Sequence, residues 1–377
     1  SYMGPIGIPW TAFTHGMDKA GEISPLCINC GLCGTVCPVG IDIPTLIMRV
    51  KQRDVEQYGQ PKANLFIARL EGFSKFASVT APITNRLLEN GFFRLLMEKA
   101  AGLDRRRPIP HYRRETFVKW FKNYHPKGRR KVAYFVDVYV NYNDPDLGRA
   151  VVEVLEKNDV EVIVPPQRQS GMPYLSYGNI RMAEDTMRFN VESLSRVVEK
   201  GYDIIASEPT AAFCLKKQYP ELLGDGKARL VADHSFEVFE YLDDLYVKGL
   251  FNSHIKPLRK MVVGYYTPCH TKSMFSHRPV VKILEMLGLD VKIIDYGCCG
   301  IAGTFGYKRG LEGYDLSVEI GKRLFEMMMN PEIELGVTES SVCKLHMQAA
   351  ISKKVIHPAK LLREGYATPS ALGDLRL

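Results

Sequence analysis

The sequence lacks the patterns that would place a segment across a membrane. It contains no apolar run near 20 residues, the length that a membrane-spanning helix needs, and no signal-peptide pattern. Nothing in it is therefore predicted to span a bilayer. With 377 residues, 46% of them hydrophobic, the chain can bury a sizeable core and is predicted to form two or three globular domains.

The sequence also lacks a fingerprint for an organic redox cofactor. Its glycine-rich stretch GIAGTFGYKRG does not follow the G-x-G-x-x-G order of dinucleotide-binding loops, and no Asp follows at the proper distance. No flavin or nicotinamide motif occurs elsewhere. If the chain binds a redox-active metal centre, it is expected to transfer single electrons, and another subunit is expected to convert the substrate.

Cysteine, by contrast, is arranged in an unusual way. Eight of the nine cysteines fall into two clusters with ligand-type spacing. Such clusters favour metal binding in a reducing compartment over a disulfide framework. The protein is therefore expected to be cytoplasmic.

The first cluster, CINCGLCGTVCP, holds Cys27, Cys30, Cys33 and Cys37 at the C-x2-C-x2-C-x3-C-P spacing of bacterial ferredoxins. Zinc ribbons use paired C-x2-C units far apart, so this run predicts a [4Fe-4S] cluster. In two-cluster ferredoxins the fourth cysteine binds the other cluster, and no second run is present here. Three alternatives stay open: an upstream run is missing, Cys37 closes a single cluster, or another subunit supplies the complement.

The second cluster consists of Cys269 in YYTPCH, the pair Cys298 and Cys299 in CCGIAG, and Cys343 in SVCKLH. Each follows a predicted strand, and ligands in parallel sheets bind beyond the carboxyl ends of strands. Gly300 allows the backbone to turn tightly after the cysteine pair. These four residues are predicted to bind one metal centre.

The rest of the chain divides into helical and α/β parts. Apolar residues recur at helical spacing within 41–103, and strands are predicted at 132–140, 160–166 and 202–209, then at 261–269, 291–298 and 334–340. This repetition predicts two α/β lobes related by a pseudo-twofold axis. We divide the chain into a ferredoxin-type domain (1–60), a helical, basic connector (61–131), a first lobe (132–250) and a second lobe (251–377).

The connector concentrates the positive charge of the chain. Residues 105–131 carry eleven Lys or Arg against one Glu, a charge of +10, whereas the whole chain carries +8. Phe117, Trp120 and Phe121 lie at helical spacing among them, which suits a helix lying on an anionic membrane surface. A solvated basic face or an interface with another chain is the alternative, and a nucleic-acid site is disfavoured.

Four stretches, YFVDVYVNYNDPDLG, CCGIAGTFGYKR, ESSVCKLHMQ and VIHPAKLL, resemble a known family. This is the cysteine-rich CCG-domain family of heterodisulfide reductases, lactate and glycolate oxidase iron-sulfur subunits, and the C subunits of anaerobic glycerol-3-phosphate dehydrogenases, which the chain resembles over nearly its whole length. The resemblance implies two domain copies, each with a lone Cys, a Cys-Cys-Gly and a Cys-x-x-Cys. In the family these cysteines hold unusual iron-sulfur clusters or, in one relative, zinc.

The sequence departs from the family pattern in both copies. Aligned by strands, the first copy has no cysteine at the equivalent positions, which are Val138, Gln169, Ser170 and Ala211. In the second copy Ser340 replaces one cysteine, which leaves four thiolates, enough for an iron or zinc site. Ser340, His270 and His346 are the candidates to complete a larger cluster. Cys214 and His357 are expected to be structural.

The resemblance implies the iron-sulfur electron-transfer subunit of a membrane-associated flavoprotein dehydrogenase, which does not act on the substrate itself. Electrons would pass from a partner's FAD through the first cluster to the second centre and then to quinone at the cytoplasmic face of the membrane. A further iron-sulfur or anchor subunit is a possible partner, and nucleic acid is not expected. The alternatives are thiol-disulfide chemistry like that of heterodisulfide reductases, an iron-sulfur subunit of a lactate, glycolate or succinate dehydrogenase, and a structural zinc module.

Overall fold

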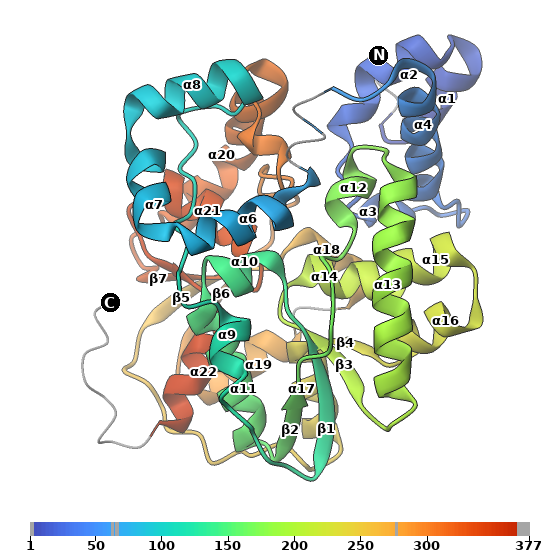
Figure 1. Ribbon diagram of the computed structural model, residues 1–377. Coiled ribbons are helices and arrows are strands. Elements are labelled where there is room, and N and C mark those ends of the chain that lie inside the picture. Colours follow the sequence, from blue (N-terminus) through green and yellow to red (C-terminus); the bar gives the residue numbers. More distant parts are fainter. Residues whose placement is uncertain (1–3, 62–63, 65–67, 276–277, 368–377) are drawn as a thin grey trace.

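The computed structural model describes residues 4–61, 64, 68–275 and 278–367. A helical N-terminal part precedes two α/β lobes, each built on a four-stranded parallel sheet (Figure 1). The strand orders are β2-β1-β3-β4 and β6-β5-β7-β8, so each strand of the first lobe has a counterpart in the second. This confirms the predicted fold class.

The strands are short and rich in β-branched and aromatic residues. The first sheet contains β1 (Arg130–Phe135), β2 (Val160–Ile163), β3 (Asp203–Ala206) and β4 (Ser235–Glu237). The second contains β5 (Val262–Tyr266), β6 (Asp290–Ile294), β7 (Leu335–Val337) and β8 (Val355–Ile356). The sequence predicted three strands in each lobe. It missed β4 and β8, because three and two residues carry too little periodicity.

Helices surround both sheets. Those of the first lobe are α10 (Val138–Tyr142), α11 (Pro145–Lys157), α12 (Met172–Ser176), α13 (Ile180–Val198), α14 (Pro209–Phe213), the π-helix η2 (Cys214–Gln218), α15 (Tyr219–Leu223), α16 (Gly226–Asp233) and α17 (Val238–Val247). Those of the second are α18 (Cys269–Met274), α19 (Arg278–Met286), η3 (Phe305–Tyr307), η4 (Leu311–Asp315), α20 (Leu316–Met328), α21 (Ser341–Ala350) and α22 (Pro358–Tyr366). The predicted strand 132–140 ends early because Asp137 accepts the N–H of Tyr139 at 2.8 Å and begins α10.

The N-terminal part is helical, as predicted. It contains α1 (Gly7–Thr14), α2 (Met17–Ile23), η1 (Ser24–Leu26), α3 (Leu32–Thr35), α4 (Ile43–Tyr58), α6 (Leu70–Val79), α7 (Ala81–Glu89), α8 (Gly91–Ala101) and α9 (Phe117–Phe121). The amphipathic run from Ile83 to Ala101 is broken at Asn90, whose side chain accepts the N–H of Phe93 at 3.0 Å and caps α8. In the described part of the chain, no helix combines the length and apolar character that crossing a membrane requires.

The basic stretch buries the first of its three aromatic rings in the first lobe. Phe117 is fully buried and its ring packs edge-on against Tyr134, with centroids 5.5 Å apart. Trp120 and Phe121 are half-buried and pack against the same core. Phe117 is therefore not available to a lipid headgroup layer, because α9 is short and turns this ring to the first lobe, whereas contact of Trp120 and Phe121 with a membrane surface stays a prediction.

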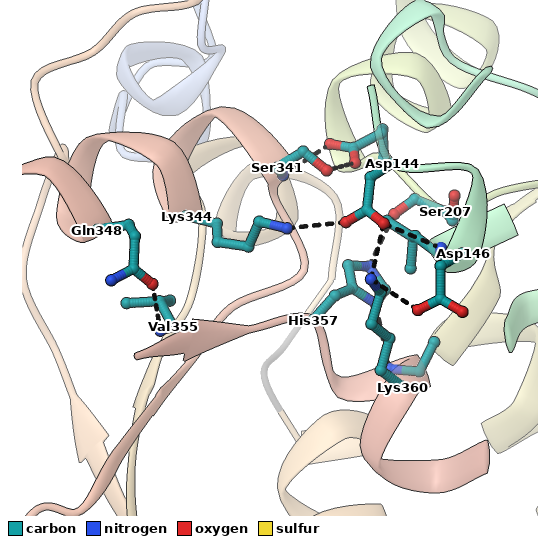
Figure 2. Close-up of polar contacts among 12 residues, drawn as sticks. Asp144, Asp146, Ser207, Ser341, Lys344, Gln348, Val355, His357 and Lys360 are labelled. Carbon is teal, nitrogen blue, oxygen red and sulfur yellow. Dashed lines mark hydrogen bonds and ion pairs between the residues drawn. The ribbon is translucent and has the colours of Figure 1, made fainter. Parts of the chain in front are cut away.

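The two lobes share one hydrophobic core, in which Leu155 of the first lobe and Leu284 of the second are both fully buried. A polar seam lies beside this core (Figure 2). In it, Asp144 at the start of α11 pairs with Lys344 of α21 at 2.9 Å and Lys360 of α22 at 2.7 Å. This packing fixes the carboxyl ends of the two sheets relative to each other.

Candidate metal centre

The four cysteines of the second lobe come from three strand ends. Cys269 is the first residue of α18, Cys298 and Cys299 follow β6, and Cys343 lies in the first turn of α21. The sulfur atoms of Cys299 and Cys343 are 3.1 Å apart. Cys298 contacts Cys269 on one side and Cys299 on the other, so the four thiols form one continuous group.

This group stabilises negative charge at its centre. The thiols of Cys269 and Cys299 lie against Cys298, and these two contacts lower the pKa of Cys298 to about 3. The same contacts, together with burial, raise the pKa values of Cys269 and Cys299 well above the usual range. A thiolate is the form of cysteine that binds metal, and here its neighbours favour it.

Gly300 makes the tight turn after the cysteine pair. Its φ is +94°, and a Cβ atom built there would collide with the carbonyl oxygen of Ser317. The equivalent glycine of the first lobe, Gly171, has a φ of +90°, but a Cβ there would meet only the flexible end of Met187 at 3.1 Å. The two lobes thus have the same turn, and the second lobe leaves less room for a side chain at Gly300 than the first lobe does at Gly171.

Replacing Gly300 by Ala is expected to destabilise the protein more than replacing Gly171 by Ala. Both variants acquire the left-handed strain of about 1–2 kcal/mol, but only Gly300→Ala also forces backbone atoms apart. Thermal unfolding of the two variants checks this expectation. Equal losses in Tm would show that the Ser317 carbonyl does not restrict the turn.

The ferredoxin-type run lies at the other side of the site. Burial, followed by the nearby Cys27 and Cys30, raises the pKa of Cys33 to about 11. The sulfur of Cys27 accepts the N–H of Asn29 at 3.4 Å, and the sulfur of Cys37 accepts the N–H of Ile41 at 3.3 Å. Gly31, with a φ of +82°, allows the turn between Cys30 and α3.

The two cysteine clusters are in contact, and the sequence did not predict this. The thiol of Cys269 lies against Cys30, and this contact lowers the pKa of Cys30. Phe213 of the first lobe and Ser273 of α18 lie directly against Gly31 and hold the loop there. No periodicity or spacing in the sequence reports such a contact between residues 239 positions apart. The thiols therefore form a row from the ferredoxin-type run to Cys343.

Ser340, His270 and His346, the candidates to complete a larger cluster, differ in whether they have an atom free to bind it. Both ring nitrogens of His346 are engaged, Nδ1 with Arg107 and Nε2 with the carbonyl oxygen of Ser317 at 3.2 Å. The hydroxyl of Ser340 accepts the N–H of Cys343 at 3.4 Å and caps α21. Neither arrangement supports a ligand role.

His270 is the exception among these candidates. Its Nδ1 is 3.0 Å from the hydroxyl of Thr210, and burial lowers its pKa to about 4, so the ring is neutral. Its Nε2 is buried and has no hydrogen-bond partner among the described residues. Of the three candidates, His270 alone has a nitrogen free to bond a bound group.

The first lobe repeats the backbone of the site without its thiols. Val138 begins α10 as Cys269 begins α18, and Ala211 is the third residue of α14 as Cys343 is of α21. Cys214 is fully buried and donates to the carbonyl oxygen of Ser170 at 3.1 Å, which is the core role expected of it. His357 is also structural, since its Nδ1 accepts the N–H of Ala359 at 3.1 Å.

The chemistry of the second-lobe residues fits a thiolate-bound metal. Within the described ranges, no three Cys, His, Asp or Glu side chains have the spacing found around a metal ion. The donor set is nevertheless suitable: four sulfurs, three of them buried, converge at strand ends beside a thiolate-stabilising hydrogen-bond network.

Comparison with known proteins agrees with this geometry. The model of the CCG cysteine-rich domain matches residues 263–348, from β5 to α21. The C subunit of the anaerobic glycerol-3-phosphate dehydrogenase of Escherichia coli K12 is 31% identical over 311 residues, which cover 81% of this chain and 77% of that protein. The chain belongs to this CCG-domain family.

More distant relatives place the CCG-domain chain in a wider group. It is 29% identical over 240 residues to the B subunit of the fumarate reductase (CoM/CoB) of Methanothermobacter marburgensis, covering 62% of this chain and 44% of that one. It is 22% identical over 330 residues to the D-2-hydroxyglutarate dehydrogenase of Haemophilus influenzae, covering 81% and 31% respectively.

Proposed function

We propose that this CCG-domain protein is the iron-sulfur electron-transfer subunit of a membrane-associated flavoprotein dehydrogenase similar to the glycerol-3-phosphate enzyme. The contact between Cys30 and Cys269 is the observation that carries the proposal. Two redox centres held at these thiols would be adjacent, as an electron relay requires. A storage or structural role would not need the two sites to touch.

The proposed ligands are the eight clustered cysteines. Cys27, Cys30, Cys33 and Cys37 hold a [4Fe-4S] cluster, and Cys269, Cys298, Cys299 and Cys343 hold a second iron-sulfur cluster or zinc. A bound iron-sulfur cluster supplies one-electron transfer at this place. The protein residues position the thiolates, exclude water through their burial and adjust the charge around the site.

The proposed partner is an FAD-containing dehydrogenase subunit, and the proposed acceptor is a quinone reached from the cytoplasmic face of the membrane. The relative with 31% identity is itself named as one subunit of a dehydrogenase, which supports a multisubunit complex. In such a complex this chain does not bind the dehydrogenase substrate.

Thiol-disulfide chemistry is the second candidate, because one subunit of a fumarate reductase (CoM/CoB) is among the relatives. The resemblance described above connects that chemistry with cysteine sets in both domain copies. Here Val138, Ser170 and Ala211 occupy the equivalent positions of the first copy. This loss favours electron transfer.

Isolation of the native complex tests the proposal. We expect a flavoprotein to co-purify, iron and acid-labile sulfide to be present in the CCG-domain chain, and glycerol 3-phosphate or a related hydroxy compound to reduce an artificial dye through the complex. Zinc without iron, or a chain that purifies without any flavoprotein, would contradict it. Iron with activity only towards disulfides would favour the second candidate.

A further inference from the structure

A cavity of about 240 Å³ lies between the two lobes at the cysteine site. One wall carries Cys269, Cys298, Cys299 and Cys343, and the facing wall carries the first-lobe residues that stand where cysteines are absent, including Val138, Gln169 and Ser170. The cysteine-free copy therefore borders the same space as the cysteine-bearing copy.

The cavity extends beyond the thiols into an apolar region. Leu70 and Phe73 of α6, Met97 of α8, Ile109 and Tyr112 line this region. These side chains offer no metal ligand, so a metal centre at the cysteines would leave this part of the cavity to another occupant. A cavity of about 150 Å³ is enough to admit benzene, and the whole cavity here, including the space at the thiols, is about 240 Å³.

Two buried polar atoms on the cavity lining have no hydrogen-bond partner among the described residues. The amide nitrogen of Gln169 donates to the carbonyl oxygen of Ala68 at 3.0 Å, which fixes the amide orientation and leaves Oε1 unpaired. The second atom is Nε2 of His270, in the other lobe. Both side chains are more than nine-tenths buried, at 6% and 8% exposure. Leaving a buried polar atom unpaired destabilises the fold, so each of these atoms indicates a missing ligand contact.

The charge of the first-lobe wall favours an uncharged ligand. Glu208 lines the cavity and accepts the N–H of Ser341 at 3.0 Å. Burial, followed by the nearby Asp137, raises the pKa of Glu208 to about 8, so it is mostly protonated at neutral pH. Asp137 also has a raised pKa because of burial. A wall without full negative charge does not attract a cation.

We propose that the cysteine-free copy has become the wall of a binding site for a flat, uncharged, lipophilic compound of the quinone class, which bonds His270 in both redox forms and Gln169 in the hydroquinone form. This inference rests on the proposed function, in which such a compound accepts the electrons. When Thr210 donates to Nδ1 of His270, Nε2 carries the proton and donates to an oxygen of either redox form. Oε1 of Gln169 can only accept, so it pairs with the hydroxyl of the hydroquinone and not with the carbonyl of the quinone.

Direct binding tests the site. The isolated complex is titrated anaerobically with a short-chain naphthoquinone and with its hydroquinone, and both dissociation constants are measured. Gln169→Leu is expected to weaken hydroquinone binding about five- to tenfold and to change quinone binding little, because only one hydrogen bond is lost. Gln57→Leu, an exposed position on α4, is the matched control and is expected to change neither.

A second variant tests the cavity by volume. Val138→Trp places a ring in the cavity and is expected to abolish binding of both forms, whereas Val247→Trp, at an exposed position on α17, is expected to leave it intact. Circular dichroism and iron content establish that each variant folds. Gln169→Leu, which is close in volume to the native residue, keeps the test informative if Val138→Trp does not fold.

The outcomes separate the site from the proposed function. Unchanged binding in both Gln169→Leu and Val138→Trp, or an equal loss of quinone and hydroquinone in Gln169→Leu, would overturn the site. A complex that reduces a dye but binds no naphthoquinone would also overturn the site and leave electron transfer standing. Displacement of the naphthoquinone by an organic disulfide, with tighter disulfide binding, would show that the ligand class is wrong.

Discussion

Cys343→Ser is expected to remove the metal of the second lobe. Cys343 lies 3.1 Å from Cys299 and is almost completely buried, so a serine there replaces a thiolate ligand with a hydroxyl that binds iron and zinc poorly at neutral pH. Iron and acid-labile sulfide per chain should fall to the amount held by the ferredoxin-type run, and electron transfer to quinone should be lost. Because metal bonds also contribute to folding, Tm should fall as well.

Cys214→Ser is the matched control for this experiment. Cys214 is the fully buried thiol of the first lobe, and it donates to the backbone of the cysteine-free turn at Ser170. Its replacement should leave the metal content and the optical spectrum unchanged and cost about 1 kcal/mol in core packing. Release of iron by Cys214→Ser would mean that the first lobe also binds metal.

The geometry also decides which cysteine substitution should remove the cluster of the ferredoxin-type run without disturbing the metal centre of the second lobe. Cys30 belongs to the ferredoxin-type run but contacts Cys269, so Cys30→Ser is expected to disturb both sites. Cys33 lies within α3 near Cys27 and Cys30. Cys33→Ser is therefore the better variant for removing the first electron paramagnetic resonance signal while sparing the second.

The repeated fold could be predicted from the sequence because its signals are local. Period-two runs such as 261–269 and the turn after Cys299 identify strand ends, and parallel strands bring those ends to one edge. The register between the copies is supported by the matching first residues of α10 and α18. These local patterns alone are enough to predict that the four thiols of the second lobe converge at one edge of the sheet.

The remaining features depend on tertiary packing. Phe117 has the spacing of an amphipathic surface helix, and only the arrangement of β1 and α9 places its ring in the core. The contact of Cys30 with Cys269 depends on how the N-terminal loop lies on α14 and α18. Gln169 was recognised only as a missing cysteine, because nothing in the sequence reports that its Oε1 is buried without a partner.

Asp144→Asn is expected to destabilise the protein by about 3 kcal/mol at pH 7, since it leaves two partly buried ammonium groups, Lys344 and Lys360, without their shared counter-ion. Asn is as good an N-cap as Asp, so the start of α11 is preserved and the loss reports the charge alone. Figure 2 shows both lysines reaching Asp144 from the second lobe, so the loss is one of lobe docking. Urea unfolding measures it.

The pH dependence of this loss follows from the direction of the pKa shift. Burial acts to raise the pKa of Asp144, but the charges of Lys344 and Lys360 outweigh it and hold the pKa well below the usual range. A carboxylate with a depressed folded pKa contributes stability that is present above its unfolded pKa of about 3.9 and is lost as the pH falls further. The difference between wild type and Asp144→Asn should therefore be the same at pH 7 and pH 5.

Asp146→Asn, at a half-exposed neighbour that pairs with Lys360 and Arg363, should cost about 1 kcal/mol or less. Equal costs for the two substitutions, or a cost for Asp144→Asn that disappears by pH 5, would show that the ion pairs do not hold the lobes together.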